Sequence, residues 1–226
     1  ASREIGMMSK YGGGTSAYLG NIRPRGMSIS TGGKADGPVH YARMYDTTVD
    51  VCKQAEARRG ACAVYLPVEH DDINEFLDIG TEGNPIQNLQ YGVTITDDWM
   101  KSMIGGAKRK REVWAKIIQR RNEFGFPYIM FKDNTNNNSP YKELGLEITA
   151  SNLCSEIQLP TDSYNSFVCC LGSINLLHWD EIKDTDAIEI YTQFLNAVMD
   201  EFISKSAVLP GLARANRFAE QHRAIG

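Results

Sequence analysis

The chain has 226 residues, of which 42% are hydrophobic and 23% charged, and its formal net charge is -4. This composition is typical of a globular protein with one sizeable core or two small ones, and the slight negative charge argues against a surface that binds nucleic acid. No apolar stretch reaches the roughly 18–20 residues that a membrane-spanning helix needs, so we expect a soluble, cytoplasmic protein.

The five cysteines are an odd number without a repeating spacing, which is a poor basis for a disulfide framework. No C-x-x-C pair suggests a zinc site, and we predict no bound metal. We therefore expect free thiols in a reducing compartment, where a disulfide would be catalytic rather than structural. The chain starts at Ala1 inside a helix-compatible stretch and stops after "NRFAEQHRAIG", so we expect a fragment of a longer protein.

Helix and strand patterns alternate along the chain after a glycine-rich segment at 11–37. The apolar spacing and the turn residues predict these elements: helices over 39–57, 71–80, 108–123 and 186–205, with another that Thr96 or Asp97 caps; strands over 61–67, 89–96, 126–131 and 166–176; and a loop at 133–140. This alternation predicts an α/β architecture with mainly parallel strands. Apolar residues of the last helix are predicted to lie in the core: Ile188, Tyr191, Phe194, Leu195, Val198 and Phe202.

The stretch "SNLCSEI" (151–157) sets an amide, a thiol and a carboxylate two residues apart. If the stretch is extended, Asn152, Cys154 and Glu156 share one face, spaced by roughly 6.5–7 Å, about the width of a sugar ring with its hydroxyls. Glu156 then suits a base for a hydroxyl proton, and the amide suits a hydrogen-bonding partner. From the spacing alone, a buried structural thiol beside a surface carboxylate on a half-buried strand is the favoured interpretation.

Several segments together resemble the large, catalytic subunit of class I ribonucleotide reductase. "ASNLCSEIQLPTD" is similar to the active-site segment of that family, and "NSFVCCLGSINLLHWDEI" to the segment that follows it. "GNIRPRGMSI", "KQAEARRGACAVYLPVEHDDINEFLDI", "YGVTITDDWM" and "FAEQHRAIG" occur in the family's order. The resemblance therefore covers nearly the whole chain, and the ordered set is more specific than a lone N-x-C-x-E.

The resemblance implies a ten-stranded α/β barrel, here partial, with the reactive cysteine on an inner loop. Residues 1–226 would be a single incomplete catalytic barrel domain, with effector-specificity loops and helices in 1–60 and the first barrel strands and the cysteine loop in 61–226. Cys154 would become a thiyl radical that removes the 3′ hydrogen of the substrate. Glu156 would be the base on the 3′ hydroxyl, and Asn152 would hold the ribose hydroxyls.

The family also reduces the 2′ carbon with two thiols that become a disulfide. Cys169 matches one of these thiols, and the matching position of the other lies upstream of Ala1. Cys170 is adjacent to Cys169, so on a strand only one of the two would face the substrate. Cys52 and Cys62 do not match, and we interpret them as thiols of a helix contact and a strand core.

The resemblance places further ligand contacts in the first third of the chain. The literal G-x-G-x-x-A at Gly12 does not follow a predicted strand, so we do not predict a dinucleotide fold. The resemblance instead assigns these residues to the substrate: Gly13, Gly14 and Arg58, with Leu153 and Ser155 beside the cysteine. It assigns to a deoxynucleoside triphosphate effector the phosphate contact Arg23, the base contact Ile29, and Gln54. Ala55 and Glu56 replace glycines that commonly follow Gln54 in the family, which leaves the link from effector to substrate base open.

The implied activity is reduction of ribonucleoside diphosphates for DNA precursor synthesis, with deoxynucleoside triphosphates and ATP as effectors. A separate small subunit with a di-metal centre would generate the radical, and thioredoxin or glutaredoxin would supply electrons. The resemblance implies a homodimer of the full-length subunit and no cofactor bound by this chain. Because the tyrosines that deliver the radical are absent here, we expect the isolated chain to be inactive.

Three alternatives stay open at this level. A cobalamin-dependent reductase has a similar active-site motif and needs no second subunit. A nucleotide-binding module that has lost its chemistry would retain only effector or partner contacts. The third alternative is one piece of a split enzyme, which co-purification with a chain that carries the remaining barrel strands would support.

Overall fold

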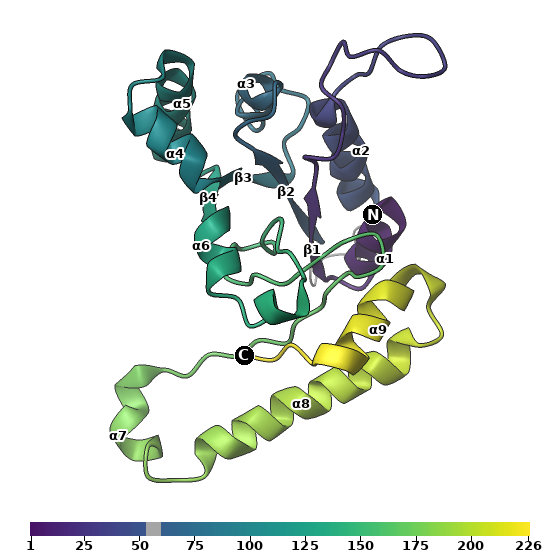
Figure 1. Ribbon diagram of the computed structural model, residues 1–226. Helices are drawn as coiled ribbons and strands as arrows, with labels where there is room; N and C mark the ends of the chain where they lie inside the picture. The colour runs from purple at the N-terminus through teal and green to yellow at the C-terminus, as the bar shows by residue number, and fades with distance from the viewer. Residues whose placement is uncertain (53–59) are drawn as a thin grey trace. The chain divides into compact units, whose positions relative to one another are not determined.

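The computed structural model describes residues 1–52 and 60–226 (Figure 1). The predicted ligand contacts Gln54 and Arg58 lie outside the described residues. The chain divides into two compact units, Ala1–Leu159 and Pro160–Gly226, and each unit is described by itself. The prediction of a single incomplete barrel domain stays a prediction.

The first unit is built on a four-stranded sheet in which every pair of neighbouring strands is parallel. The strands lie in chain order: β1 (Gly14–Tyr18), β2 (Ala61–Pro67), β3 (Leu89–Ile95) and β4 (Tyr128–Phe131). Parallel neighbours need a crossover connection, and helices lie in the described connections. The sheet confirms the predicted α/β class. Its first strand lies in the glycine-rich segment, where the sequence predicted none.

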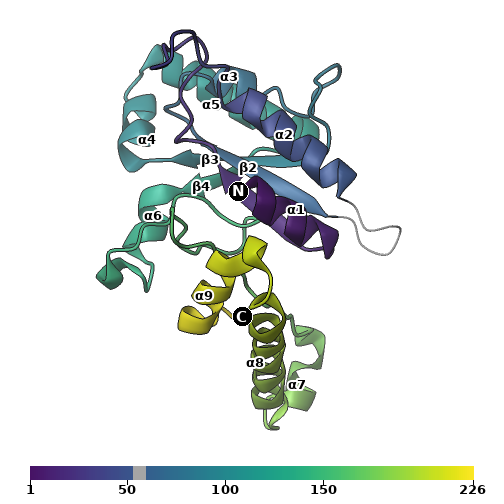
Figure 2. The ribbon, with the colours of Figure 1, turned by 90° about the vertical axis from the view of Figure 1, so that its right-hand side faces the viewer.

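Helices of the first unit cover the sheet and connect its strands. They are α1 (Ser2–Lys10), α2 (Pro38–Val51), α3 (Ile73–Phe76), α4 (Asp97–Ile104), α5 (Lys108–Phe124), α6 (Lys132–Asn137) and the 3-10 turn η1 (Lys142–Leu144). Thr96 caps α4 as predicted, because its hydroxyl accepts a hydrogen bond from the N–H of Trp99 at 3.3 Å. In Figure 2, α2, α3 and α5 lie on one side of the strands and α6 on the other.

The two faces of the sheet differ in side-chain size. On β2, Cys62, Val64 and Leu66 are fully buried in the main apolar core with the helices. The other face combines glycine and alanine with the rings of Tyr18, Tyr65 and Tyr128, and a side chain at Gly14 or Gly92 would collide with Leu153 or Tyr65 there. Because both faces are covered, β2 reads in sequence as a continuous apolar run rather than an alternating one.

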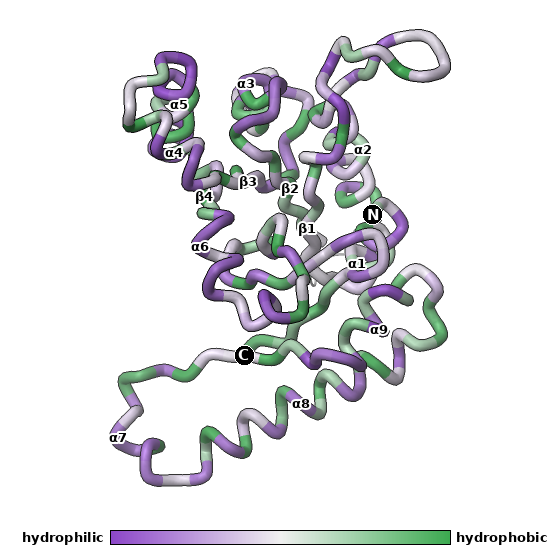
Figure 3. Tube along the Cα trace, viewed as in Figure 1, coloured by the Kyte–Doolittle hydropathy of each residue, from purple (hydrophilic) through white to green (hydrophobic). Residues whose placement is uncertain are grey.

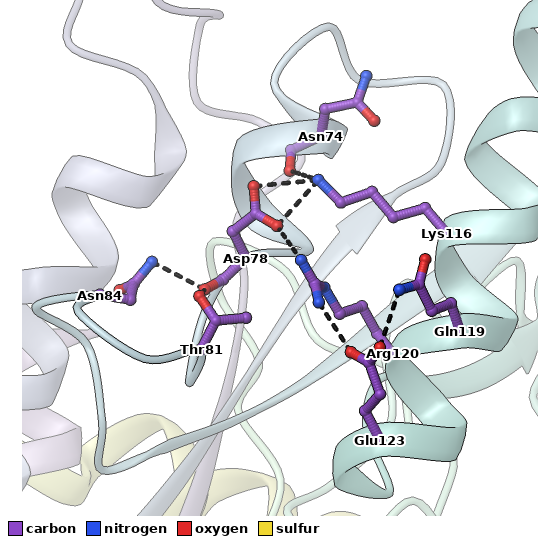
Figure 4. A network of polar contacts seen from close by, with 8 residues as sticks. All are labelled: Asn74, Asp78, Thr81, Asn84, Lys116, Gln119, Arg120 and Glu123. Atoms are coloured by element: carbon purple, nitrogen blue, oxygen red, sulfur yellow. Dashed lines mark hydrogen bonds and ion pairs between the residues drawn. The ribbon is translucent and has the colours of Figure 1, made fainter.

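A polar network joins α5 to the loop after α3 (Figure 4). The carboxylate of Asp78 accepts hydrogen bonds from Lys116 Nζ at 3.0 Å and Arg120 Nη2 at 2.9 Å, and Arg120 also pairs with Glu123 at 2.8 Å. Burial alone would raise the pKa of the Asp78 carboxyl, but the hydrogen bonds from Lys116 and Arg120 outweigh it and lower that pKa. The network therefore ties together segments 38 to 42 residues apart.

The second unit consists of helices and connecting segments. Its elements are η2 (Leu176–His178), α7 (Trp179–Ile182), α8 (Ala187–Ser206), η3 (Pro210–Leu212) and α9 (Ala213–His222). Helices α8 and α9 are joined by Asn216, whose amide nitrogen donates to the carbonyl of Ile203 at 2.7 Å and to the hydroxyl of Ser206 at 2.8 Å. These hydrogen bonds tie α9 to the last turn of α8.

Two predicted elements are wrong. Residues 132–137 form α6 where a loop was predicted. The side-chain amide of Asn136 donates to the carbonyls of Lys132 and Ile148, both at 2.9 Å, and these hydrogen bonds stabilise the helix instead of a turn. Residues 166–176 form no strand, since a strand requires a neighbour. Within Pro160–Gly226 the pairing there is one bridge between Cys170 and Ile225.

Helix α8 has the predicted position, but its predicted core face is only partly correct. Leu195 and Met199 are buried, whereas Phe194 is 59% exposed and Ile188 and Val198 are exposed as well. Figure 3 shows hydrophobic and hydrophilic residues alternating along α8. The apolar stripe of α8 is therefore wider than the part that other residues of the second unit cover, and its uncovered part includes Phe194.

Candidate active site

The "SNLCSEI" stretch forms a closed turn at the end of the first unit. The N–H of Asn152 donates to the carbonyl of Ile157 at 3.1 Å, and the N–H of Ile157 donates back to Oδ1 of Asn152 at 3.1 Å. The buried hydroxyl of Ser151 donates to the same carbonyl of Ile157 at 2.6 Å. Ser155 has a φ of 68°, the left-handed conformation that reverses the chain. We call residues 151–157 the cysteine turn.

The prediction of an extended stretch with three groups on one face is therefore wrong. Asn side chains compete with strand pairing by bonding to nearby backbone groups, and here the amide of Asn152 closes the turn. Cys154 and Glu156 remain exposed, while Asn152 is half-buried. The turn still gathers the thiol and the carboxylate, but through chain reversal rather than through strand alternation.

The surroundings of Cys154 favour the thiol over the thiolate. Partial burial raises the pKa of Cys154, and the negative charge of Glu156 raises it further. A thiol that attacks as a nucleophile needs a lowered pKa, because the thiolate is the reactive species. The electrostatics around Cys154 therefore suit a thiol that gives or takes a hydrogen atom better than a thiolate nucleophile.

Tyr65 on β2 holds the cysteine turn from the side of the sheet. Its phenol donates to the carbonyl of Asn152 at 2.8 Å, across 87 residues of sequence. Tyr65 also belongs to a small apolar cluster with Ala63 and Ala150, against which Leu153 packs. The sequence interpretation missed Tyr65. The signal in the sequence was strand alternation: Tyr65 lies between Val64 and Leu66 on β2, so its side chain points to the opposite face from theirs.

Gly14 and Gly13, predicted substrate contacts, have clear packing roles. A Cβ atom on Gly14 would lie 2.5 Å from Cδ2 of Leu153, so glycine is required where the cysteine turn meets β1. A Cβ atom on Gly13 would lie 2.7 Å from Cε of Met8, the end of a flexible side chain. Their contacts with a substrate, like those of Leu153 and Ser155, stay predictions.

The predicted effector residues lie in a turn-rich loop before α2. Arg23 is exposed and Ile29 is half-buried. Arg25, which the sequence interpretation missed, anchors this loop, because its backbone N–H donates to Asp72 at 2.8 Å and its guanidinium pairs with Glu75 at 2.6 Å. The contacts of Arg23 and Ile29 with an effector stay predictions.

The remaining cysteines have distinct environments. Cys62 is fully buried, and burial raises its pKa to about 11, which fits the predicted strand-core thiol. Cys52 is half-buried after the end of α2. Cys169 and Cys170 are half-buried in the second unit, and the backbone of Cys170 pairs with Ala224 and Gly226 at 3.0 and 3.1 Å. Burial raises the pKa of Cys170.

Two searches of the described residues bear on ligands and on membranes. Residues 1–52 and 60–226 contain no group of three or more histidine, cysteine, aspartate or glutamate side chains placed to hold a metal ion. Over the same residues, no helix combines the length and the apolarity needed to cross a bilayer.

Comparison with known proteins gives one consistent match. A family model described as "Ribonucleotide reductase, barrel domain" matches residues 1–110 and 105–226. The chain is 31% identical over 245 residues to the "Putative ribonucleoside-diphosphate reductase large subunit" of Frog virus 3, covering 99% of the chain and 42% of the viral protein. It is 32% identical over 224 residues to the "Vitamin B12-dependent ribonucleoside-diphosphate reductase" of Thermoplasma acidophilum, covering 88% of the chain and 28% of that protein.

A solved structure supports the same conclusion. The "Actinobacillus ureae class Id ribonucleotide reductase alpha subunit" superimposes with a TM-score of 0.92 at 52% identity, over 100% of this chain and 42% of that one. The chain thus spans less than half the length of these relatives. The match confirms the predicted reductase-type barrel fold, of which the parallel sheet is a part. The chain belongs to the ribonucleotide reductase large-subunit family, and it contains residues of that family's barrel domain.

Proposed function

We propose that the protein containing this chain reduces ribonucleoside diphosphates to 2′-deoxyribonucleoside diphosphates, with Cys154 as the radical site. The observation that carries the proposal is the exposed, protonated thiol of Cys154 at the tip of a turn, two residues from the exposed carboxylate of Glu156. A protonated thiol is the form that donates a hydrogen atom. Family membership supplies the reaction class, and the turn supplies the local chemistry.

In the proposed reaction, a thiyl radical at Cys154 takes the 3′ hydrogen atom of the ribose. An S–H bond forms as the C3′–H bond breaks, which leaves the radical on C3′. Glu156 accepts the proton of the 3′ hydroxyl while the 2′ hydroxyl, protonated by a reductive thiol, leaves as water. Cys169 and a second thiol become a disulfide and supply two electrons and two protons: one proton leaves in the water, and the other forms the new C2′–H bond. Glu156 returns its proton to the 3′ oxygen, Cys154 returns its hydrogen atom to C3′, and the thiyl radical is restored.

The proposal includes partners that the relatives' names suggest only in part. We propose a radical-generating small subunit, a homodimer of the full-length large subunit, and thioredoxin or glutaredoxin as the reductant. Deoxynucleoside triphosphates and ATP would act as effectors, with Arg23 and Ile29 among their contacts. We propose a cytoplasmic location, because these partners act in a reducing compartment.

Substitution of single cysteines in the full-length subunit tests the reaction. Cys154→Ser should abolish deoxynucleotide formation with the small subunit present, and Cys169→Ser should abolish multiple turnovers. Cys170→Ser is the matched control, since the described contacts of Cys170 within the second unit are made by its backbone. Normal turnover by Cys154→Ser would refute the assignment of Cys154 as the radical site, whereas no turnover by the wild-type subunit would favour a protein that only binds nucleotides.

A cobalamin-dependent reaction is the second candidate, because a relative named for vitamin B12 is as similar in sequence as the viral large subunit. The class Id subunit, at 52% identity, favours the two-subunit reaction. Assay of the large subunit with adenosylcobalamin and without a small subunit decides between them. Turnover under those conditions would assign the protein to the cobalamin branch.

A further inference from the structure

Tyr65 is the buried polar residue that connects the sheet to the cysteine turn. It lies in the middle of β2 and is fully buried, although its phenol is polar. That phenol donates to the carbonyl of Asn152 at 2.8 Å. A buried hydroxyl is costly without a partner, so this hydrogen bond accounts for a tyrosine at a position where phenylalanine would fill the same space.

The neighbouring strand is shaped to admit the ring of Tyr65. Gly92 on β3 is the register partner of Tyr65, and a Cβ atom on Gly92 would lie 2.4 Å from Cε1 of that ring. The ring therefore occupies the space that a side chain at position 92 would otherwise fill. This close contact fixes the direction of the phenol toward the cysteine turn.

The phenol remains a hydrogen-bond donor throughout the physiological range. Burial raises the pKa of Tyr65 to about 12, although the nearby hydroxyls of Ser155 and Ser151 act in the opposite direction. Ser155 and Asn152 lie on either side of Cys154 along the chain. The hydroxyl of Tyr65 thus lies beside both arms of the turn that carries the thiol.

We propose that Tyr65 is a positioning residue, which fixes the thiol of Cys154 through the hydrogen bond from its phenol to the carbonyl of Asn152. The expected effect on the rate of ribonucleotide reduction rests on the proposed function, whereas the expected effect on the position of Cys154 does not. Tyr65 acts through the turn and makes no contact with the reacting atoms in this scheme. Hydrogen-atom transfer depends steeply on the placement of the thiol, and a displacement of about 1 Å can reduce a rate by roughly 100-fold.

The test is Tyr65→Phe in the full-length subunit, with Tyr91→Phe as the matched control. Tyr91 is buried in β3 on the helix-covered face, and its hydroxyl has no hydrogen-bond partner among the described residues. Both changes remove one buried hydroxyl, but only Tyr65→Phe releases the cysteine turn. The first measurement is alkylation of Cys154 by iodoacetamide against pH, followed by peptide mass spectrometry. The second is kcat and KM for ribonucleotide reduction.

We expect Tyr65→Phe to increase alkylation of Cys154 at pH 8 several-fold and to lower the midpoint pH, because a looser turn weakens the partial burial and the contact with Glu156 that raise the pKa of the thiol. We expect kcat to fall roughly 10- to 100-fold with KM little changed. Tyr91→Phe should match the wild type in both measurements. A wild-type alkylation profile in Tyr65→Phe would overturn the inference whatever the value of kcat.

A second variant perturbs the same hydroxyl without removing it. Gly92→Ala places a methyl group against the ring of Tyr65 and displaces its hydroxyl. It should therefore also increase the alkylation of Cys154. This variant decides the question if Tyr65→Phe folds poorly, and a wild-type alkylation profile in a folded Gly92→Ala would count against the inference. If the wild-type subunit forms no deoxynucleotide, the proposed function fails while the alkylation measurements still test Tyr65.

Discussion

Replacing Gly14 by alanine should displace the cysteine turn from the sheet. The added Cβ atom would lie 2.5 Å from Cδ2 and 3.5 Å from Cβ and Cγ of Leu153. Carbon atoms in ordinary contact are about 3.5–4.0 Å apart, so the tip of Leu153 must move by about 1 Å or more. Overpacking of this kind costs about 1–3 kcal/mol.

Part of that cost is offset by the unfolded state. Alanine loses less backbone entropy than glycine on folding, which favours the substitution by about 0.4–1 kcal/mol where the backbone permits it. Gly14 is not among the residues with positive φ, so its backbone permits alanine. We therefore expect Gly14→Ala to lower the free energy of unfolding by about 1–2 kcal/mol. Denaturant titration of the full-length subunit measures this value, and alkylation of Cys154 reports whether the turn has moved.

Two further variants make the reasoning refutable. Gly13→Ala would meet Met8 rather than Leu153, with Cε at 2.7 Å and the carbonyl oxygen at 3.3 Å, so it should leave the alkylation of Cys154 unchanged. In a double-mutant cycle, Leu153→Ala should remove most of the cost of Gly14→Ala, because the colliding atoms are gone. Additive costs in that cycle, with an unchanged alkylation rate at Cys154, would show that Gly14 does not support the turn.

Three other outcomes are expected. Asp78→Asn should lower the free energy of unfolding at pH 7 by about 1–2 kcal/mol, since Lys116 and Arg120 lose a charged acceptor. The pKa of Asp78 is lowered by folding, so its contribution is present above the ordinary carboxyl pKa and disappears as the pH falls through the lowered value. Denaturant titrations at pH 7 and pH 3 should therefore differ less for Asp78→Asn than for the wild type, and equal differences would contradict the assignment. Thr96→Ala should lower the free energy of unfolding by about 1 kcal/mol, because α4 loses its cap, whereas Thr96→Ser keeps the capping hydroxyl and should retain most of that stability. Glu156→Gln should lower the midpoint pH of Cys154 alkylation, because burial raises the pKa of Cys154 and the charge of Glu156 raises it further; an unchanged or higher midpoint would remove Glu156 from that role.

Local patterns were sufficient for the elements with a marked apolar pattern. The predicted strands at 61–67 and 89–96 and the helix at 108–123 agree with β2, β3 and α5 to within a residue or two at each end. Each has a strong apolar pattern and a clear ending, such as the left-handed Gly125 after α5. The failures came where polar residues form long-range contacts, as at Asn136 in α6.

The candidate site was predictable in its residue types and not in its geometry. The spacing of Asn152, Cys154 and Glu156 indicated a group of reactive side chains, and the ordered motifs indicated the family. An extended conformation was the simplest interpretation of that spacing, and it was wrong. The side chain of Asn152 bonds to the backbone of Ile157, five residues on, so a local bond that the extended interpretation ignored changed the conformation.

The amino-acid sequence by itself determined the α/β class, the free thiols and the family, because these depend on composition, periodicity and ordered motifs. Only the tertiary structure decided what holds Cys154 in place. The supports of the cysteine turn are Tyr65 and Gly14, which precede it by about 90 and 140 residues. A hydrogen bond or a steric fit across such a separation leaves no local pattern, since it exists only after β1 and β2 have paired and the turn has folded onto the face that carries Ala63 and Tyr65.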